Sequence, residues 1–409
     1  MINFINIHKL GLEKFNFIFL LLLILSIPTQ ETPKLIFWSL YVISSLFLLI
    51  TSSQKRKWDL LDTLIVIWML SGLIVAFFSG IQHKEWSGST DLIIFTSILL
   101  ILKKSDTSYD NINIIFYIIL LSTLVASLLA IWQLVYLNNK EFIELHSVGH
   151  VNHSAIYLSL SLAVIIAILY TKWKTSRIAS RIFLLSIYAS IAITLVLTDS
   201  RAAILASVLL LVFFLYLFRK QLSLSLILIS ILLFFTGGNY FITGGGIIEK
   251  QIDQVERDIF FQARIKIWRS AILAWQQHPV FGVGIKNYDQ VSLDNLLAWC
   301  DKGSDVCNPD DYLPYAHGHS LYINTLTERG LFGFFVVFIN ISMLIFLIYK
   351  YRPDSTDNGN YIMLWSAAFG MLFLNLIIGL FNTTLHHENA LLSMIVIGLW
   401  LGKTYGRAE

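Results

Sequence analysis

"GLFGFFVVFINISMLIFLIY", residues 330–349, contains no charged side chain over a length that suits a membrane-spanning helix. A helix of about 20 apolar residues crosses the roughly 30 Å hydrocarbon core of a bilayer. Runs of this kind recur along the chain, and twelve are long enough, or nearly so, to cross. They cover residues 15–28, 35–51, 60–81, 90–102, 112–137, 154–171, 182–198, 202–218, 223–243, 330–349, 361–381 and 390–402. The sequence therefore predicts an all-α integral membrane protein with about twelve transmembrane helices.

The composition of the 409-residue chain excludes a soluble globular protein. Hydrophobic residues make up 56% of the chain and charged residues only 13%, about half the share usual in soluble domains. Too little polar surface remains to cover a soluble globule of this size. The first apolar run follows Lys9 and Lys14, and no small-residue cleavage site comes after it. We therefore expect an uncleaved first span.

Lysine and arginine are unevenly distributed between the two sets of connections. With a cytoplasmic N-terminus, the inside segments and both tails hold 17 of the 29 Lys and Arg residues. The short outside loops hold four, which are Lys34, Lys84, Lys140 and Arg201. The other eight lie in one long outside segment, which the positive-inside rule does not count. We expect both termini in the cytoplasm.

The predicted spans divide the chain into three parts. These are residues 1–243 with nine helices, the outside segment 244–329, and residues 330–409 with three helices and a short cytoplasmic tail. In the outside segment, residues 247–279 carry apolar side chains such as Ile265, Trp268 and Ile272 at helical spacing. This pattern predicts one or two amphipathic helices at the membrane surface, ended by Pro279.

Cationic side chains mark two places on the predicted outer face. Arg201, in "LTDSRAAI", sits on a very short connection, where its guanidinium is costly without an anionic partner or access to headgroups. Arg264, Lys266 and Arg269 follow one another in "FFQARIKIWRSAILAW", and such cations grip phosphate oxygens well. The alternatives are a snorkelling Arg201 paired with Asp199 and an amphipathic helix resting on anionic headgroups.

A histidine marks the outer end of the run at 330–349. His319 in "HGHSLYINTLTER" precedes Gly330 by eleven residues, which on a continuous helix is about three turns and nearly the same face. We expect Gly330 to allow close approach of another helix or a lipid chain. A neutral imidazole is suited to take a proton from a hydroxyl near pH 7. A polar membrane anchor is the alternative role for His319.

The sequence offers no pattern typical of a metal site. Metal-dependent glycosyl transfer needs clustered carboxylates, and the chain contains no Asp-x-Asp. Cys300 and Cys307, the two cysteines, lie in the outside segment, where an oxidising compartment would let them pair. Two free thiols are the alternative. We expect neither a metal nor another cofactor.

These motifs together resemble the bacterial O-antigen ligase family, within the O-antigen ligase and polymerase superfamily. The family shows a histidine followed by Asn, Ser or Gln, then nine residues and Gly-x-x-Gly, which matches His319, Ser320, "LYINTLTER" and "GLFG". It also shows an arginine with a tryptophan four positions later, then His-Pro and a glycine-rich turn. Here these are Arg264, Trp268, His278-Pro279 and "FGVG", and a Ser-Arg pair between earlier spans matches Ser200-Arg201.

The resemblance implies an enzyme with GT-C-like architecture in the bacterial inner membrane and an active site on the periplasmic face. The expected reaction in lipopolysaccharide biosynthesis is metal-independent, inverting transfer of O-antigen polysaccharide from undecaprenyl pyrophosphate to a sugar hydroxyl of lipid A–core. The expected partners are that donor, that acceptor and membrane lipid, with no nucleic acid.

The resemblance also assigns roles to particular residues. His319 would deprotonate or orient the acceptor hydroxyl, and Arg264 and Arg201 would bind the donor pyrophosphate and stabilise its departure. Three residues are weaker candidates for the donor site: Lys266, Arg269 and His317. His150 and His153, in "HSVGHVNHSAIY", are candidates for acceptor contacts.

The sequence is compatible with three rival functions. A protein O-oligosaccharyltransferase would use the same chemistry on a protein hydroxyl, and an O-antigen polymerase would extend the repeat units. A transporter or flippase of lipid-linked glycans belongs to another class, and would show repeated halves and charges buried in mid-span. The gathering of polar residues on one predicted face favours chemistry at the outer surface.

Overall fold

The computed structural model describes residues 2–51, 56–136, 143–242, 259–301, 307–354 and 356–408. Within these ranges the chain forms helices and no strand, which confirms the predicted all-α class. The α-helices are α1 (Ile2–Ser26), α2 (Glu31–Thr51), α3 (Leu60–Phe78), α4 (Glu85–Lys104), α5 (Tyr109–Tyr136), α6 (Val151–Lys172), α7 (Ile178–Val196), α8 (Arg201–Leu217), α9 (Leu222–Ile242), α11 (Ile259–Gln277), α12 (Leu293–Asp301), α13 (Leu321–Lys350), α14 (Gly359–Ile378) and α15 (His387–Ala408). Three short 3-10 helices are η1 (Arg219–Gln221), η2 (Tyr288–Gln290) and η3 (Pro309–Asp311).

Each of the twelve predicted apolar runs overlaps one helix, in the order α1–α9 and α13–α15. Among the described residues, eight helices are long and apolar enough to cross a membrane: α2 to α7, α13 and α14. Arg201–Leu217 and Leu222–Gly238 are shorter apolar helices. The chain is therefore a multi-pass membrane protein, and the total of twelve spans stays a prediction.

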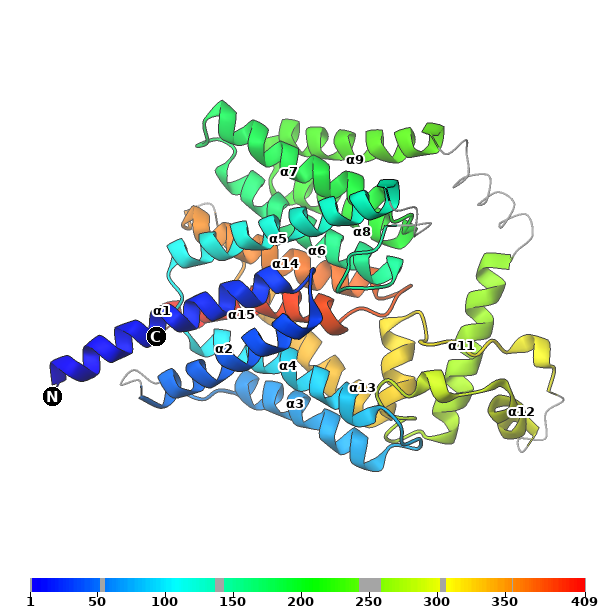
Figure 1. Ribbon diagram of the computed structural model, residues 1–409. Coiled ribbons are helices and arrows are strands. Elements are labelled where there is room, and N and C mark those ends of the chain that lie inside the picture. Colours follow the sequence, from blue (N-terminus) through cyan, green and yellow to red (C-terminus); the bar gives the residue numbers. More distant parts are fainter. Residues whose placement is uncertain are drawn as a thin grey trace.

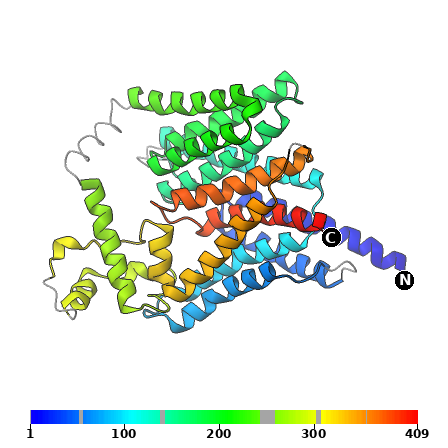
Figure 2. The ribbon, with the colours of Figure 1, turned by 180° about the vertical axis from the view of Figure 1, so that it is seen from behind.

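The long helices lie side by side in one bundle, and the two ends of that bundle differ (Figure 1). Helix α11 stands across one end of the bundle with α12 beside it, whereas both termini lie at the other end (Figures 1 and 2). A helix that crosses the bundle axis in this way is oriented as an amphipathic surface helix would be, and its placement at the membrane surface stays a prediction. Its end at Gln277, just before Pro279, also agrees with the prediction. The start of the predicted amphipathic stretch, residues 247–258, lies outside the described residues.

Helix α6 forms the centre of the bundle. Its residues from Ser154 to Tyr170 are all buried, and α6 packs against α14, α7, α8 and α5. Small side chains allow the close approach: a Cβ at Gly370 of α14 would lie 2.7 Å from the Ala163 Cβ. Hydroxyl contacts add polar links between helices, such as Ser207 Oγ to Ser159 Oγ at 3.1 Å. Close packing and these hydrogen bonds hold helices together in a membrane, where hydrophobic burial contributes little.

Ion pairs join the connections at the end that carries the termini. Lys103, with 2% of its side chain exposed, places its Nζ 2.7 Å from Asp62 Oδ1 and 2.6 Å from Asp59 Oδ2. Lys403 Nζ pairs with Asp106 at 2.7 Å. Arg56 Nη1 donates to two backbone carbonyls, those of Lys103 and Gly402. The lysines and arginines of several predicted inside segments are therefore gathered at one end of the bundle.

Candidate functional site

Four connections meet at the end of the bundle where α11 lies. Each precedes or joins helices of the bundle: residues 143–150 before α6, 197–200 before α8, 312–320 before α13, and 379–386 between α14 and α15. Hydrogen bonds and ring contacts link them. Ser200 Oγ donates to Asn152 Oδ1 at 3.4 Å, and the ring centroids of His153 and His317 are 5.7 Å apart. Side chains far apart in the sequence therefore share one site.

Backbone strain is concentrated at the same end. Among the described residues, five that are not glycine have a positive φ: Asp199 at 57°, Lys286 at 66°, His319 at 46°, Leu385 at 53° and His387 at 45°. A left-handed backbone costs such a residue roughly 1–3 kcal/mol and persists only where the surroundings fix it. Strain of this kind collects at functional sites, so its distribution points to this end of the bundle.

Six of the ten histidines form a continuous group, which we call the histidine cluster: His150, His153, His317, His319, His386 and His387. The ring centroids of His317 and His319 are 4.4 Å apart. His153 lies at the centre, 5.7 Å from both His317 and His386 and 6.4 Å from His150. The sequence predicted that His317, His319, His150 and His153 lie on one face but gave no reason to place them in contact.

Backbone hydrogen bonds hold His319 in place. The Gly318 N–H donates to Asn324 Oδ1 at 2.8 Å, and the Leu321 N–H donates to the Gly379 carbonyl at 2.7 Å. The first bond ties the strained turn to α13, and the second ties the start of α13 to the end of α14. His319 is therefore anchored on two helices, as the precise placement of a catalytic group requires.

Burial keeps the imidazoles of His317 and His319 neutral. Burial, with smaller effects of His317 and Arg264, lowers the pKa of His319 to about 3, and the Asn382 side chain acts in the opposite direction. Burial likewise lowers the pKa of His317 to about 4. The Nδ1 of His319 is buried without a hydrogen-bond partner among the described residues. At neutral pH the His319 ring is therefore uncharged, and its Nδ1 has an unsatisfied hydrogen-bonding capacity.

The two predicted arginines come together beside His319. Arg264 on α11 is half-buried, and its guanidinium carbon lies 5.7 Å from the centroid of the Phe381 ring. Burial lowers the pKa of Arg264, and the positive charge of Arg201, at the start of α8, lowers it further. Because Arg264 also acts on the pKa of His319, Arg264 lies within electrostatic reach of both Arg201 and His319. The structure thus brings together the predicted histidine and both predicted arginines.

The other two cations of α11 have different surroundings. Successive helical residues are rotated by about 100°, so Lys266 cannot share the face of Arg264. Arg269 Nη1 pairs with Asp311 Oδ1 at 3.0 Å, and both side chains are about half exposed. No contact described in the structure links Lys266 or Arg269 to the histidine cluster, and their role at a donor site stays a prediction.

Trp268 is a further candidate for the anion site around Arg264. It lies one helical turn after Arg264, on the same face of α11. Its Nε1 is buried and has no hydrogen-bond partner among the described residues. An unsatisfied indole N–H near Arg264 can donate a hydrogen bond to a bound anion.

The glycine motif has a structural role that differs from the predicted one. Gly330 is not helical, with φ 60° and ψ −167°, so it breaks α13 rather than returning to the face of His319. A Cβ there would lie 2.3 Å from the carbonyl of Val280. What approaches Gly330 is therefore the turn after α11, not a helix or a lipid chain as predicted.

Backbone hydrogen bonds join this turn to both sides of the break. The Leu331 N–H donates to the Pro279 carbonyl at 2.8 Å, and the Gly284 N–H donates to the Glu328 carbonyl at 3.0 Å. Gly282, with φ 72°, passes so close to α13 that a Cβ would lie 2.5 Å from the Thr327 carbonyl oxygen. These contacts fix α11, with Arg264, relative to the first half of α13, which follows His319.

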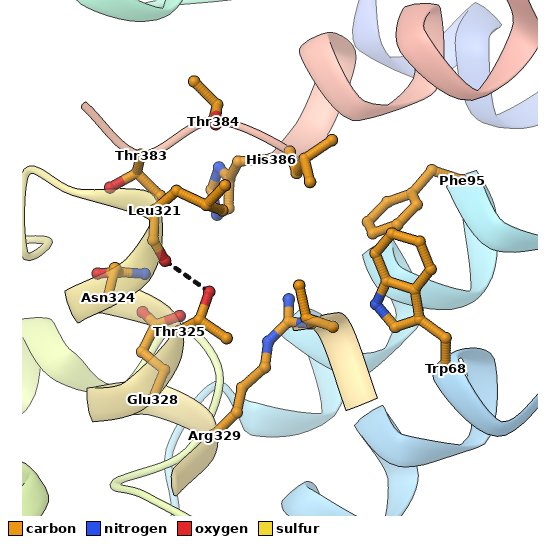
Figure 3. Close-up of a pocket in the computed structure, with 12 residues that line it drawn as sticks. Trp68, Phe95, Leu321, Asn324, Thr325, Glu328, Arg329, Thr383, Thr384 and His386 are labelled. Carbon is orange, nitrogen blue, oxygen red and sulfur yellow. Dashed lines mark hydrogen bonds between the residues drawn. The ribbon is translucent and has the colours of Figure 1, made fainter. Parts of the chain in front are cut away.

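A small cavity lies next to the histidine cluster (Figure 3). It measures about 20 Å³, enough for a single water molecule, and its lining includes His386, Asn324, Glu328 and Arg329. Figure 3 shows Arg329 pointing into the cavity from α13, with Asn324 and Glu328 on the same helix. Glu328 and Arg329 lie on the part of α13 that precedes the break at Gly330, and the bounds of the outside segment 244–329 stay a prediction.

The predictions for the two cysteines and for a metal site have different outcomes. The structure pairs Cys300 and Cys307 in a disulfide, with 6.0 Å between their Cα atoms. No group of three or more His, Cys, Asp or Glu among the described residues is placed to hold a metal ion, and metal independence stays a prediction.

His386 and Asn382 were missed as site residues. The signal that could have found them is "NTTLHHEN", a polar stretch between two apolar runs on the predicted outer face.

The fold and the site define a polytopic, all-helical membrane protein with paired arginines and neutral histidines at one end of its bundle. Residues 184–338 match a family model described as O-antigen ligase, and the match supports membership of the O-antigen ligase/polymerase family. The matched region contains Arg201, Arg264, His319 and Gly330, whereas His153 and His386 lie outside it. A comparison with curated proteins gave no match. The matched family is a glycosyltransferase-like group of ligases and polymerases, and it implies a lipid-linked polysaccharide substrate in a membrane.

Proposed function

We propose that the protein is an O-antigen ligase of lipopolysaccharide biosynthesis. It would transfer O-antigen polysaccharide from undecaprenyl pyrophosphate to a sugar hydroxyl of lipid A–core, without a metal and with inversion at the anomeric carbon. The observation that carries this proposal is the grouping of His319, Arg264 and Arg201. A neutral base next to two cations is what such a reaction needs when the leaving group is a pyrophosphate.

The chemistry assigns one task to each kind of side chain. His319, neutral at pH 7, accepts the proton of the acceptor hydroxyl as its oxygen forms a bond to the anomeric carbon. The bond from that carbon to the pyrophosphate oxygen breaks, and the oxygen keeps the electron pair. Arg264 and Arg201 stabilise the charge that develops there, because guanidinium groups bind phosphate oxygens bidentately. Attack opposite the leaving group inverts the anomeric centre.

The proposed location is the bacterial inner membrane, with both termini cytoplasmic, the site on the periplasmic face and a GT-C-like arrangement of the bundle. Two observations support this orientation. The end opposite the site carries the lysine- and arginine-rich connections, which favour the cytoplasm. The Cys300–Cys307 disulfide lies beside α12, at the end of the site, and disulfides persist in oxidising compartments such as the periplasm.

Complementation in matched Gram-negative hosts tests the proposed reaction. In a host that lacks its ligase but keeps the matching core and O-antigen pathway, the protein should restore the lipopolysaccharide ladder on a silver-stained gel. Restoration only in a polymerase-deficient host would replace the proposal with an O-antigen polymerase. Glycosylation of a co-expressed pilin without a ladder would replace it with a protein O-oligosaccharyltransferase. Accumulation of donor on the outer face without transfer to any acceptor would indicate a flippase.

A further inference from the structure

A large cavity opens at the end of the bundle opposite the histidine cluster. It measures about 850 Å³ and lies between the connections that follow α6, α8 and α13. Lys174, Arg219 and Arg352 line it, one from each of these connections. Three loops far apart in the sequence thus each contribute a cation to one hollow.

The cations of this cavity carry an excess of positive charge. Among the described residues, none of Lys174, Arg219 and Arg352 forms an ion pair, although their neighbours at the same end do. Asp354 is the single acidic residue in the lining, and its Oδ1 accepts the Thr356 N–H at 2.8 Å and the Thr356 hydroxyl at 2.5 Å. Its charge is therefore partly satisfied within its own loop. The cavity is therefore suited to bind an anion.

The wall of the cavity is aromatic and apolar. The Arg219 guanidinium lies 4.5 Å from the centroid of the Tyr216 ring, which leaves the edge of the guanidinium able to donate hydrogen bonds. Trp365 lines the wall and stacks on Phe369 at 5.5 Å between ring centroids. Phe369 in turn stacks on Phe213 at 4.7 Å. This aromatic series begins at the cationic rim and continues along α14 and α8 into the bundle.

We propose that this cavity binds the anionic headgroup of a phospholipid, with an acyl chain along the aromatic series on α8 and α14. A free phosphate would need the cations alone, whereas a phospholipid uses both the cations and the apolar wall. Basic pockets between transmembrane helices bind acidic lipid headgroups on the cytoplasmic side. The proposal does not rest on the proposed ligase activity, because the cavity shares no residue with the histidine cluster.

The test uses the full-length protein in phosphatidylcholine nanodiscs, with phosphatidylglycerol as the anionic probe. We expect the unfolding temperature of the wild type to rise as phosphatidylglycerol replaces phosphatidylcholine, because a lipid that binds the folded state stabilises it. In the Arg219→Gln/Arg352→Gln variant, loss of about 1 kcal/mol per cation should weaken the apparent affinity about 30-fold. The matched control Arg177→Gln/Lys350→Gln removes two exposed cations outside the cavity at the same end, and should respond like the wild type.

Two further measurements keep the proposal falsifiable. Lys174→Gln alone changes one exposed side chain and should weaken the apparent affinity about fivefold, even if the double variant fails to fold. Inorganic pyrophosphate should give no comparable stabilisation. Equal responses of the cavity variants and the control would overturn the proposal, since they would show an effect of surface charge alone. Equal stabilisation by pyrophosphate would also overturn it in favour of a free-phosphate site.

Discussion

At the scale of single residues, the site combines neutral bases with fixed cations. His319 and His317 have a pKa of about 3 and about 4 because burial penalises their charged forms. A depressed pKa makes each imidazole a weaker base, but it keeps the ring uncharged at physiological pH. Arg264 and Arg201, held close enough to act on each other, keep the charge that a departing pyrophosphate needs.

The depressed pKa values of His317 and His319 predict a loss of stability in mild acid. Unfolded histidine has a pKa near 6.5, so below this pH the unfolded chain binds protons that the folded chain refuses. Stability should therefore fall as the pH falls from about 6.5 towards 4. The measurement is the unfolding temperature in detergent between pH 7.5 and 4.5. His317→Gln/His319→Gln should show a shallower fall, and a parallel fall in the two proteins would refute the burial argument.

Substitution of Arg264 should affect transfer more than substitution of its helical neighbour Arg269. Loss of one group that stabilises developing charge costs about 10²–10³-fold in rate, so we expect Arg264→Gln to lose about this much. Arg264→Lys should recover part of the rate, since it keeps the charge but not the bidentate geometry. Arg269→Gln should cost less, because the Arg269 guanidinium is exposed and paired with Asp311. Initial rates with purified variants decide this, and an equal loss would return Arg269 to the donor site.

At the scale of elements, the break in α13 determines how the site is assembled. Gly330 lets the turn after α11 approach so closely that backbone hydrogen bonds form on both sides of the break. The helix that begins beside His319 is thus joined to the helix that carries Arg264. The spacing between His319 and Gly330 sets the distance along α13 from the base to this junction.

Gly330→Ala should therefore destabilise the protein strongly. The new Cβ would lie 2.3 Å from the Val280 carbonyl, at a φ of 60° that side chains rarely adopt. Strain and overpacking together should cost at least about 2 kcal/mol. The matched control is Gly359→Ala at the start of α14, where a Cβ meets nothing within 4 Å. Thermal unfolding of both variants measures the difference, and comparable unfolding temperatures would contradict the structural role given to Gly330.

The sequence predicted the elements better than their contacts. The apolar runs located α1–α9 and α13–α15 because a membrane-spanning helix must be long and apolar. Both properties can be read from the segment's own sequence, without knowledge of its contacts. The break at Gly330 was missed because helical geometry was extended across it, and only the turn after α11 accounts for the break. The contacts of His153 with His317 and His386 were missed because they join segments more than 150 residues apart.

At the scale of the whole molecule, the two ends of the bundle have different chemistry. One end holds α11, the disulfide, the histidine cluster and the strained connections. The other holds both termini, the ion pairs of Lys103 and Lys403, and the cationic cavity. The motif residues Arg201, Arg264 and His319 were correctly placed on one face from the sequence, because the alternation of spans fixes the side on which each connection lies.

The orientation of the bundle predicts which positions a membrane-impermeant maleimide can reach. In a Cys300→Ser/Cys307→Ser background, His146→Cys should react in intact spheroplasts, because His146 is exposed at the end that carries the site. Lys350→Cys, exposed at the opposite end, should react only after lysis. The reverse pattern would invert the proposed topology.

The most direct test of the central claim is transfer of polysaccharide by purified protein with His319 replaced. Wild type, His319→Ala and the control His146→Ala, an exposed histidine at the same end, would be given the undecaprenyl pyrophosphate-linked donor and lipid A–core. We predict that His319→Ala lowers the initial rate about 10²–10⁴-fold, the usual contribution of a positioned general base, whereas His146→Ala matches the wild type. Transfer by folded His319→Ala at the wild-type rate would contradict the account.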